Sequence, residues 1–278
     1  MRLDAAIVGA VERLSPSSES ARLDAEILLC QSIDMPRSYL FAHPEEELDT
    51  HALDRFEALL QRRLEGVPMA YISGTKEFWS HELLVSPATF VPRPETELLV
   101  NLALHEIPQD AEWQILDLGT GCGAIAVAIA GERPLCNITA TDVSAEALAI
   151  ARENIRQASL PNVSCLEGSW ATPVTGRLFN VIVSNPPYIR EDDEALQSLR
   201  HEPLSALVSG ADGLDDIRVL AVDCISSLIE NGPLMMEHGP DQQEAVAGIL
   251  NEAGWAEITC HNDLGGRPRV TVARRSGK

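Results

Sequence analysis

The sequence predicts an α/β protein: a doubly wound, mostly parallel sheet of seven strands, preceded by a small helical domain. Three observations predict this fold. The first 66 residues show helical periodicity, short apolar strands alternate with helical stretches from residue 96 onward, and a glycine-rich turn joins the first of these strands to a helix. With 278 residues and 45% hydrophobic content, the chain has enough apolar material for a real core.

Three apolar stripes at helical spacing occupy residues 1–66. The first consists of Leu3, Ile7, Val11 and Leu14. A second stripe lies around residues 21–33, and a third consists of Leu53, Phe56, Leu60 and Leu64. We expect the third helix to begin near Thr50 as its N-cap and to stop at Gly66. Since residues 1–66 carry no ligand motif, we expect this domain to dock a substrate.

Residues 67–95 differ in composition from residues 1–66, because they are rich in β-branched and aromatic residues and in proline. Gly74 stands at an expected turn, so this stretch predicts a hairpin that connects the helical domain to a sheet domain over residues 96–278. Seven apolar strands are expected in the sheet domain: 113–118, 138–142, 163–167, 179–184, 233–237, 256–261 and 269–273. Strands that alternate with helices form largely parallel sheets.

Charge and cysteine content exclude several classes of protein. With 21 basic and 42 acidic residues the net charge is −21, which repels a polyanion, so no direct nucleic-acid partner is expected. The six cysteines form no C-x-x-C pair and the seven histidines no H-x-x-x-H pair, so neither a metal site nor a disulfide framework is expected. The longest apolar run, at 124–130, is too short to span a bilayer. We expect a cytoplasmic protein with no membrane partner.

The sequence ILDLGTGCG ends a strand and turns through Gly119, Gly121 and Gly123 into a helix. Residues without a Cβ at such a turn allow close approach of a ligand to the sheet edge. Asp142 ends the next strand, 19 residues after Gly123 (142 − 123), where a carboxylate can accept hydrogen bonds from both hydroxyls of a ribose. The alternative is a tight strand-to-helix turn with a capping Asp.

The chemistry of this loop favours a cationic cofactor over a dinucleotide. A dinucleotide site has the spacing G-x-G-x-x-G, whereas this loop reads G-T-G-C-G with Asp117 two residues before it. An acidic residue is unfavourable beside a diphosphate but suits S-adenosylmethionine, which carries an ammonium and a sulfonium. Cys122 has no thiolate-activating neighbour in the sequence and is interpreted as a small loop residue.

SNPPYIR follows the strand 179–184, so Asn185 is expected at the same carboxyl edge as the glycine loop and Asp142. The Asn185 side-chain oxygen and the Pro186 carbonyl are two acceptors on a chain that Pro186 and Pro187 make rigid. Two fixed acceptors can bind both hydrogens of an NH₂ group and direct its lone pair at a methyl donor. Tyr188 can lie against the flat face of the acceptor. The alternative is an Asn-Pro-Pro turn that caps a strand beside a core Tyr.

The DLGTGCG loop, Asp142 and SNPPYI together resemble the class I S-adenosylmethionine-dependent amino-methyltransferases. Further stretches are similar to one branch, the peptide chain release factor glutamine methyltransferases. They are RLDAEILL near residue 22, EFW at 77–79, SPATFVPRPETE at 86–97, EPLSAL at 202–207 and EHG at 237–239. The resemblance covers nearly the whole chain and implies a Rossmann-like sheet.

The resemblance implies a function in translation termination. A methyl group would pass from S-adenosylmethionine to the side-chain amide N(5) of the glutamine in the Gly-Gly-Gln motif of class 1 release factors, leaving S-adenosyl-L-homocysteine. The residues that would hold the methionine part are Gly119, Thr120, Gly121, Cys122 and Gly123. Asp142 would hold the ribose and Trp170 would adjoin the adenine, while Asn185, Pro186, Pro187 and Tyr188 would hold the glutamine. Asn185, Pro186 and Tyr188 would form the catalytic set.

Some positions and alternatives remain open at this stage. The family commonly has an Asp where this chain has Ser169, and Trp170 can also be a core residue. Glu95 and Glu97 suit the N-terminus of a helix over 96–107, and neither Arg93 nor Glu95 is assigned a catalytic role. The alternative functions are amino-methylation of an adenine or guanine in DNA or RNA, which the charge disfavours, and a binding module without activity.

Overall fold

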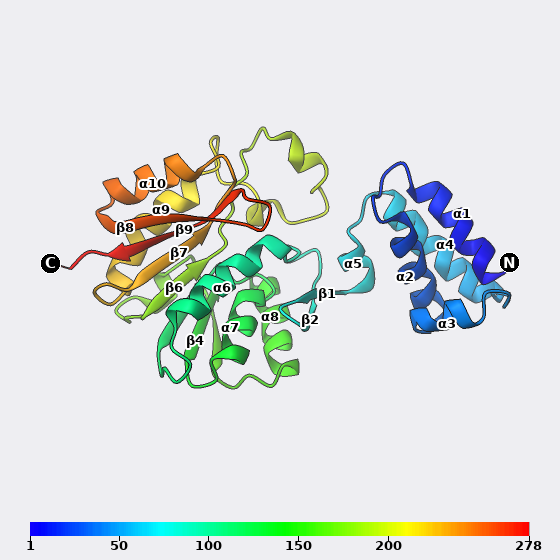
Figure 1. Ribbon diagram of the computed structural model, residues 1–278, viewed down its shortest axis with the longest axis horizontal. Coiled ribbons are helices and arrows are strands. Elements are labelled where there is room, and N and C mark those ends of the chain that lie inside the picture. The colour runs from blue at the N-terminus through cyan, green and yellow to red at the C-terminus, as the bar shows by residue number, and fades with distance from the viewer. Residues whose placement is uncertain (278) are drawn as a thin grey trace. The chain divides into compact units, whose positions relative to one another are not determined.

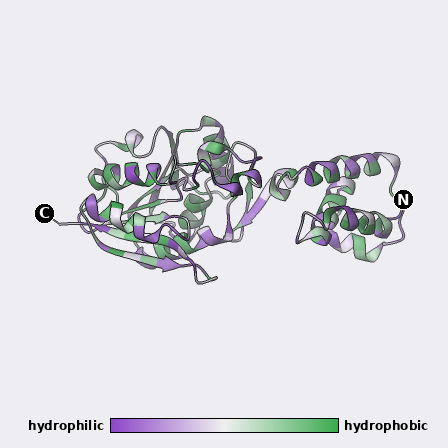
Figure 2. Ribbon diagram, turned by 90° about the horizontal axis from the view of Figure 1, so that it is seen from above, coloured by the Kyte–Doolittle hydropathy of each residue, from purple (hydrophilic) through white to green (hydrophobic). Residues whose placement is uncertain are grey.

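The computed structural model describes residues 1–277 and divides the chain into two compact units, Met1–Thr75 and Lys76–Lys278 (Figure 1). The first is helical and the second is an α/β unit. No helix within residues 1–277 has both the length and the apolar character that crossing a membrane requires. In Figure 2 hydrophobic and hydrophilic residues alternate along the helices, as expected for helices that each cover a core with one face.

The first unit packs its helices around one apolar core. The helices are α1 (Leu3–Leu14), α2 (Ala21–Ile33), α3 (Arg37–Ala42), α4 (Thr50–Leu64) and α5 (Met69–Ser73). The predicted N-terminal helices are therefore confirmed. In α1, however, Ala6 and Ala10 are fully buried, while Ile7 and Val11 pack at the margin of the core. Small side chains at the centre of the buried face allow α1 and α2 to approach closely.

Two details of the predicted helix ends and connector differ from the structure. Thr50 is the first residue of α4, not its N-cap, because the Asp49 carboxylate accepts the Ala52 N–H at 2.7 Å. Gly66 adopts the left-handed φ of 87° expected after a helix end. The stretch after Gly66 forms α5 before the hairpin, which comprises only β1 (Thr75–Phe78) and β2 (His81–Leu84).

The second unit contains the expected sheet of seven strands. They are β3 (Gln114–Leu118), β4 (Asn137–Asp142), β5 (Val163–Glu167), β6 (Val181–Ser184), β7 (Pro233–Glu237), β8 (Trp255–Asn262) and β9 (Pro268–Arg275). Their order is β5-β4-β3-β6-β7-β9-β8, and β9 runs antiparallel to both β7 and β8. The predicted seven-stranded, mostly parallel sheet is confirmed.

Helices cover both faces of this sheet (Figure 1). One layer consists of α6 (Glu97–Glu106), α7 (Ala124–Glu132) and α8 (Ala145–Gln157), and the other of α9 (Asp215–Asp223) and α10 (Gln243–Glu252). At the centre of the sheet, Leu118 pairs with Thr141 on one side and with Ser184 on the other. The segments that follow β3, β4 and β6 therefore leave the sheet at the same level.

Asn154 on α8 fastens the hairpin to the turn after β3. Its side-chain oxygen accepts the Leu84 N–H at 2.7 Å, and its amide nitrogen donates to the carbonyls of Leu84 and Cys122 at 3.0 and 2.8 Å. The side chain is buried, so its polar atoms find their partners within the protein. One side chain thus connects three segments that lie far apart in the sequence.

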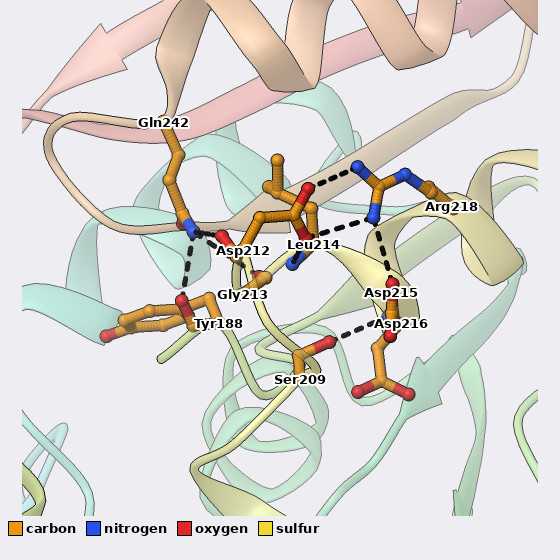
Figure 3. A network of polar contacts seen from close by, with 9 residues as sticks. All are labelled: Tyr188, Ser209, Asp212, Gly213, Leu214, Asp215, Asp216, Arg218 and Gln242. Carbon is orange, nitrogen blue, oxygen red and sulfur yellow. Dashed lines mark hydrogen bonds and ion pairs between the residues drawn. The ribbon is translucent and has the colours of Figure 1, made fainter. Parts of the chain in front are cut away.

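A polar network fixes the backbone of Tyr188 from outside the cavity described below (Figure 3). The Gln242 amide nitrogen donates to the carbonyls of Tyr188 at 2.9 Å and Gly213 at 3.3 Å. Arg218 binds the carboxylates of Asp212 and Asp215, which holds the turn that carries Gly213. The turn and Tyr188 are therefore positioned together.

Gly213 cannot be replaced without disturbing this arrangement. It has a φ of 75°, and a Cβ there would overlap the Tyr188 carbonyl oxygen and crowd the Gln242 amide. The overlapping atom belongs to backbone, so it cannot move aside as the tip of a long side chain would.

We therefore expect Gly213→Ala to lower the free energy of unfolding by roughly 2–4 kcal/mol, combining left-handed strain with overlap. Gly254→Ala is the matched control, since Gly254 has a φ of 88° but no heavy atom within 4 Å of the added Cβ. It should cost only about 1 kcal/mol from strain. Urea unfolding of both variants measures the difference, and equal losses would contradict a close approach at Gly213.

Candidate active site

A cavity of about 610 Å³ lies in the second unit at the carboxyl edge of the sheet. Its walls come from the segments that follow β3, β4, β5 and β6, and from two further stretches around residues 88–96 and 199–207. Ligands of open α/β sheets bind at this edge, and the volume suits a nucleoside-sized molecule with space beside it.

Most of the residues expected from the sequence line this one cavity. They are Gly119, Thr120, Gly121, Cys122, Asp142, Trp170, Asn185, Pro186, Pro187 and Tyr188. Gly123 is not among the lining residues. It is the N-cap of α7 with a φ of 85°, and a Cβ there would lie 3.3 Å from that of Ala151. The need for glycine at 123 therefore comes from helix packing and backbone conformation.

The Asp142 carboxylate is held by the backbone on both of its oxygens. Oδ2 accepts the Gly121 N–H at 2.8 Å and Oδ1 accepts the Ser144 N–H at 2.9 Å. Each carboxylate oxygen can accept more than one hydrogen bond, so Asp142 can still accept from a ligand in the cavity. The same contacts fix the glycine loop against the end of β4.

A second carboxylate, Asp117, lies buried beneath the loop. Burial raises its pKa to about 7, and the negative charge of Asp142 also raises it. The Thr120 hydroxyl donates to Oδ2 at 2.6 Å, whereas Oδ1 has no hydrogen-bond partner in the described chain. When it is ionised, this buried carboxylate places negative potential under the loop, and a cation above the loop would in turn favour the ionised form.

Cys122 is a buried residue of the loop. Burial raises the pKa of its thiol to about 12, so the sulfur is protonated and not nucleophilic at neutral pH. This agrees with its interpretation as a small loop residue.

Trp170 lies against the glycine loop. It has a φ of 46°, its carbonyl accepts the Thr141 hydroxyl at 3.0 Å, and a Cβ on Gly119 would lie 3.1 Å from its ring. The indole is half-buried, with part of it packed on the sheet core and part of it lining the cavity. Ser169 also lines the cavity and brings a hydroxyl to it.

Asn185 and Tyr188 line the cavity, and each forms a hydrogen bond with a buried side chain, Thr96 or Glu237. The Asn185 amide nitrogen donates to the Thr96 hydroxyl oxygen at 3.2 Å. The Tyr188 hydroxyl donates to Glu237 Oε1 at 3.2 Å, and burial raises the pKa of the phenol further above its ordinary value. The amide contact leaves the Asn185 oxygen as the group of this side chain that can accept from a ligand.

Arg93 has a structural role that the sequence patterns did not reveal. It forms an ion pair with the buried Glu202, which also accepts the Val91 N–H at 3.0 Å, and its guanidinium lies 4.8 Å from the centre of the Phe90 ring. These contacts join two walls of the cavity. Glu95 is exposed and is not among the lining residues.

Glu202, Thr96, Asn154 and Gln242 are the other supporting residues that the sequence patterns missed. Glu202 stands in EPLSAL and Thr96 in FVPRPETE, two stretches that carried the family resemblance. Neither stretch shows which residue its polar side chain contacts in the fold. The described part of the chain has no cluster of three His, Cys, Asp or Glu side chains placed to hold a metal ion.

Two family descriptions match the chain, "PrmC N-terminal domain" at residues 5–74 and "Methyltransferase small domain" at residues 95–211. The fold is similar to the crystal structure of a methyltransferase from Pyrococcus furiosus, with a TM-score of 0.55 and 19% identity, covering 78% of this chain and 98% of that one.

Curated relatives match the chain almost end to end. The release factor glutamine methyltransferase of Coxiella burnetii is 45% identical and covers 95% of each chain. The proteins of the same name from Pseudomonas aeruginosa and Escherichia coli K12 are 46% and 43% identical, each over 93% of this chain and 94% of the relative. With this identity over nearly full length, and with an α/β methyltransferase fold, the chain belongs to the release factor glutamine methyltransferase family.

Proposed function

We propose that this protein transfers a methyl group from S-adenosylmethionine to the side-chain amide nitrogen of the glutamine in the Gly-Gly-Gln motif of class 1 peptide chain release factors. The observation that carries the proposal is the position of Asn185, which shares one cavity with the glycine loop and Asp142. A methyl acceptor beside Asn185 would therefore lie next to a donor on the loop. The names of the relatives support the choice of substrate.

The cavity fits the charge and shape of this cofactor. The unpaired buried oxygen of Asp117 suits a cation on the loop, Asp142 can accept from ribose hydroxyls, and the half-buried Trp170 gives the adenine a flat apolar surface. When bound, S-adenosylmethionine supplies an electrophilic methyl group on a positively charged sulfur. The chain's own residues have to orient the acceptor.

An amide nitrogen is a weak nucleophile because its lone pair is delocalised. In the proposed site the Asn185 oxygen and the Pro186 carbonyl accept the two hydrogens of the substrate NH₂ group. Both contacts direct the lone pair and stabilise the positive charge that develops on nitrogen. Tyr188 holds the planar group in place, and the extra proton leaves to water after transfer.

We further propose that the first unit docks the release factor. It is a compact unit with its own core, and it bears the exposed apolar side chains Val8 and Phe41 on separate helices. None of the described residues that line the cavity belongs to this unit, so docking of the substrate protein is the role that we assign to it.

Mass spectrometry tests both proposals. A purified release factor incubated with the protein and S-adenosylmethionine should gain the mass of one CH₂ on its Gly-Gly-Gln peptide. RNA and DNA in the same assay should gain nothing, and methylated nucleic acid with an unchanged factor would overturn the substrate. A free Gly-Gly-Gln peptide should be methylated less efficiently than the whole factor, whereas equal efficiency would contradict docking.

Asn185→Ala removes one of the two proposed acceptors, so we expect kcat to fall by about 10²–10³. Cofactor affinity, measured by calorimetry, should change little. Asn101→Ala is the control, since Asn101 is exposed on α6 and bonds only the Glu97 carbonyl in the described chain. A near-normal kcat for Asn185→Ala would remove this side chain from the reaction.

Asp142→Ala removes charge-assisted hydrogen bonds to the ribose and releases the Gly121 N–H. At about 1.5–3 kcal/mol for such a bond, the dissociation constant for S-adenosylmethionine should rise roughly 10- to 100-fold. Asp142→Asn keeps one acceptor oxygen and should bind with intermediate affinity. Calorimetry that finds wild-type affinity for Asp142→Ala would place the ribose elsewhere.

A further inference from the structure

We propose that Glu237 is a positioning residue for the methyl acceptor, and that its buried carboxylate fixes the orientation of the Asn185 amide through Thr96 and holds Tyr188 directly. The inference rests on the proposed function, in which Asn185 and Tyr188 hold the substrate glutamine.

Glu237 is the last residue of β7 and is only 1% exposed. Oε1 accepts the Tyr188 hydroxyl, while Oε2 has no partner at normal hydrogen-bond geometry among the described residues. Thr96 is among the groups that lower the pKa of this carboxyl, so its hydroxyl lies close enough to turn toward the carboxylate. A buried carboxylate oxygen without a full partner is costly unless a nearby donor turns toward it.

If the Thr96 hydroxyl donates to Glu237, it also determines how the Asn185 amide is oriented. This hydroxyl has one hydrogen, and the buried Thr96 oxygen accepts from the Asn185 amide nitrogen at 3.2 Å. While the hydrogen points to the carboxylate of Glu237, Thr96 can only accept at Asn185. Asn185 must then present its NH₂ to Thr96, which keeps its oxygen for the cavity. The charge on Glu237 thus sets the direction of the whole chain of hydrogen bonds.

Several charged groups surround Glu237. Burial, with a smaller contribution from Glu95, raises its pKa to about 7, although Arg269 on β9 and the hydrogen bond from Tyr188 act to lower it. Arg269 also forms an ion pair with Asp263, with 3.6 Å between Nη2 and Oδ2. Its buried Nε has no hydrogen-bond partner in the described chain.

The adjacent His238 is buried and its pKa is lowered, so it stays neutral near pH 7. Glu237 is therefore the group of this cluster that changes charge near neutrality.

The sign of the pH effect follows from this chemistry. Above about pH 7 the ionised Glu237 can only accept, and the Asn185 oxygen is kept for the substrate. Below it, the protonated carboxyl can donate to Thr96, whose own hydrogen can then turn to Asn185 and reverse the amide. Activity should fall as the pH drops through the pKa of Glu237.

The test compares Glu237→Gln and Thr96→Val in the full-length protein, with a release factor as substrate. Each should lower kcat about tenfold or more, the loss expected for one hydrogen bond to a charged group. Cofactor affinity by calorimetry should stay within about twofold, well under the loss of one hydrogen bond. The double variant should be no worse than the poorer single variant, because both changes break the same chain of bonds. Thr96→Ser, which restores the hydroxyl, should recover most of kcat.

The pH profile separates positioning from general support of the fold. Wild-type kcat should rise between about pH 6 and pH 8, one unit on each side of the Glu237 pKa, and Glu237→Gln should lose that rise. Thr139→Val is the matched control, since it removes a buried hydroxyl on β4 that accepts a hydrogen bond from Arg177 in the loop before β6, and its kcat should be unchanged.

Wild-type methylation of the factor in the same assay tests the proposed function separately. If the wild type is active, any of three results overturns the positioning role: full kcat in Thr96→Val, an unchanged pH profile in Glu237→Gln, or additive losses in the double variant. If Glu237→Gln fails to fold, the Thr96→Val and Thr96→Ser pair and the wild-type profile still decide.

Discussion

The parallel pairing of β3 with β4 and with β6 is the constraint on which the site depends. Leu118 faces Thr141 on one side and Ser184 on the other, so the three strands end level with one another. The glycine loop, Asp142 and Asn185 leave the sheet at one edge as a direct result. A slip of one residue in either pairing would turn these side chains to the opposite face of the sheet.

Structural features that depend on residues close together in the sequence were well predicted. The strands follow from short apolar runs and the glycine loop from its spacing, and both lie where the periodicity placed them. The N-cap at Asp49 was missed because Asp49 and Thr50 are both good capping residues, and only the backbone shows which of them lies outside the helix. The sequence assigns Gly123 to the cofactor, but it could not show that a Cβ at this position would meet Ala151 on another helix.

The supporting residues could not be predicted, for a physical reason. Arg93 and Glu202 are 109 positions apart, and Asn154 and Leu84 are 70 apart. Glu237 lies within hydrogen-bond distance of Tyr188 because β7 pairs with β6. A buried polar side chain is satisfied by whichever segment the fold brings beside it. Nothing in the local sequence of either partner carries that information.

The ion pair of Arg93 with the buried Glu202 has a consequence for the wall of the cavity. Glu202 forms an ion pair with the Arg93 guanidinium and accepts the Val91 N–H, so the stretches around residues 88–93 and 199–207 form one wall. Parting them would leave a carboxylate in an apolar setting with neither partner. The two stretches are therefore held together as one unit, and a substitution that loosens one of them should also displace the other.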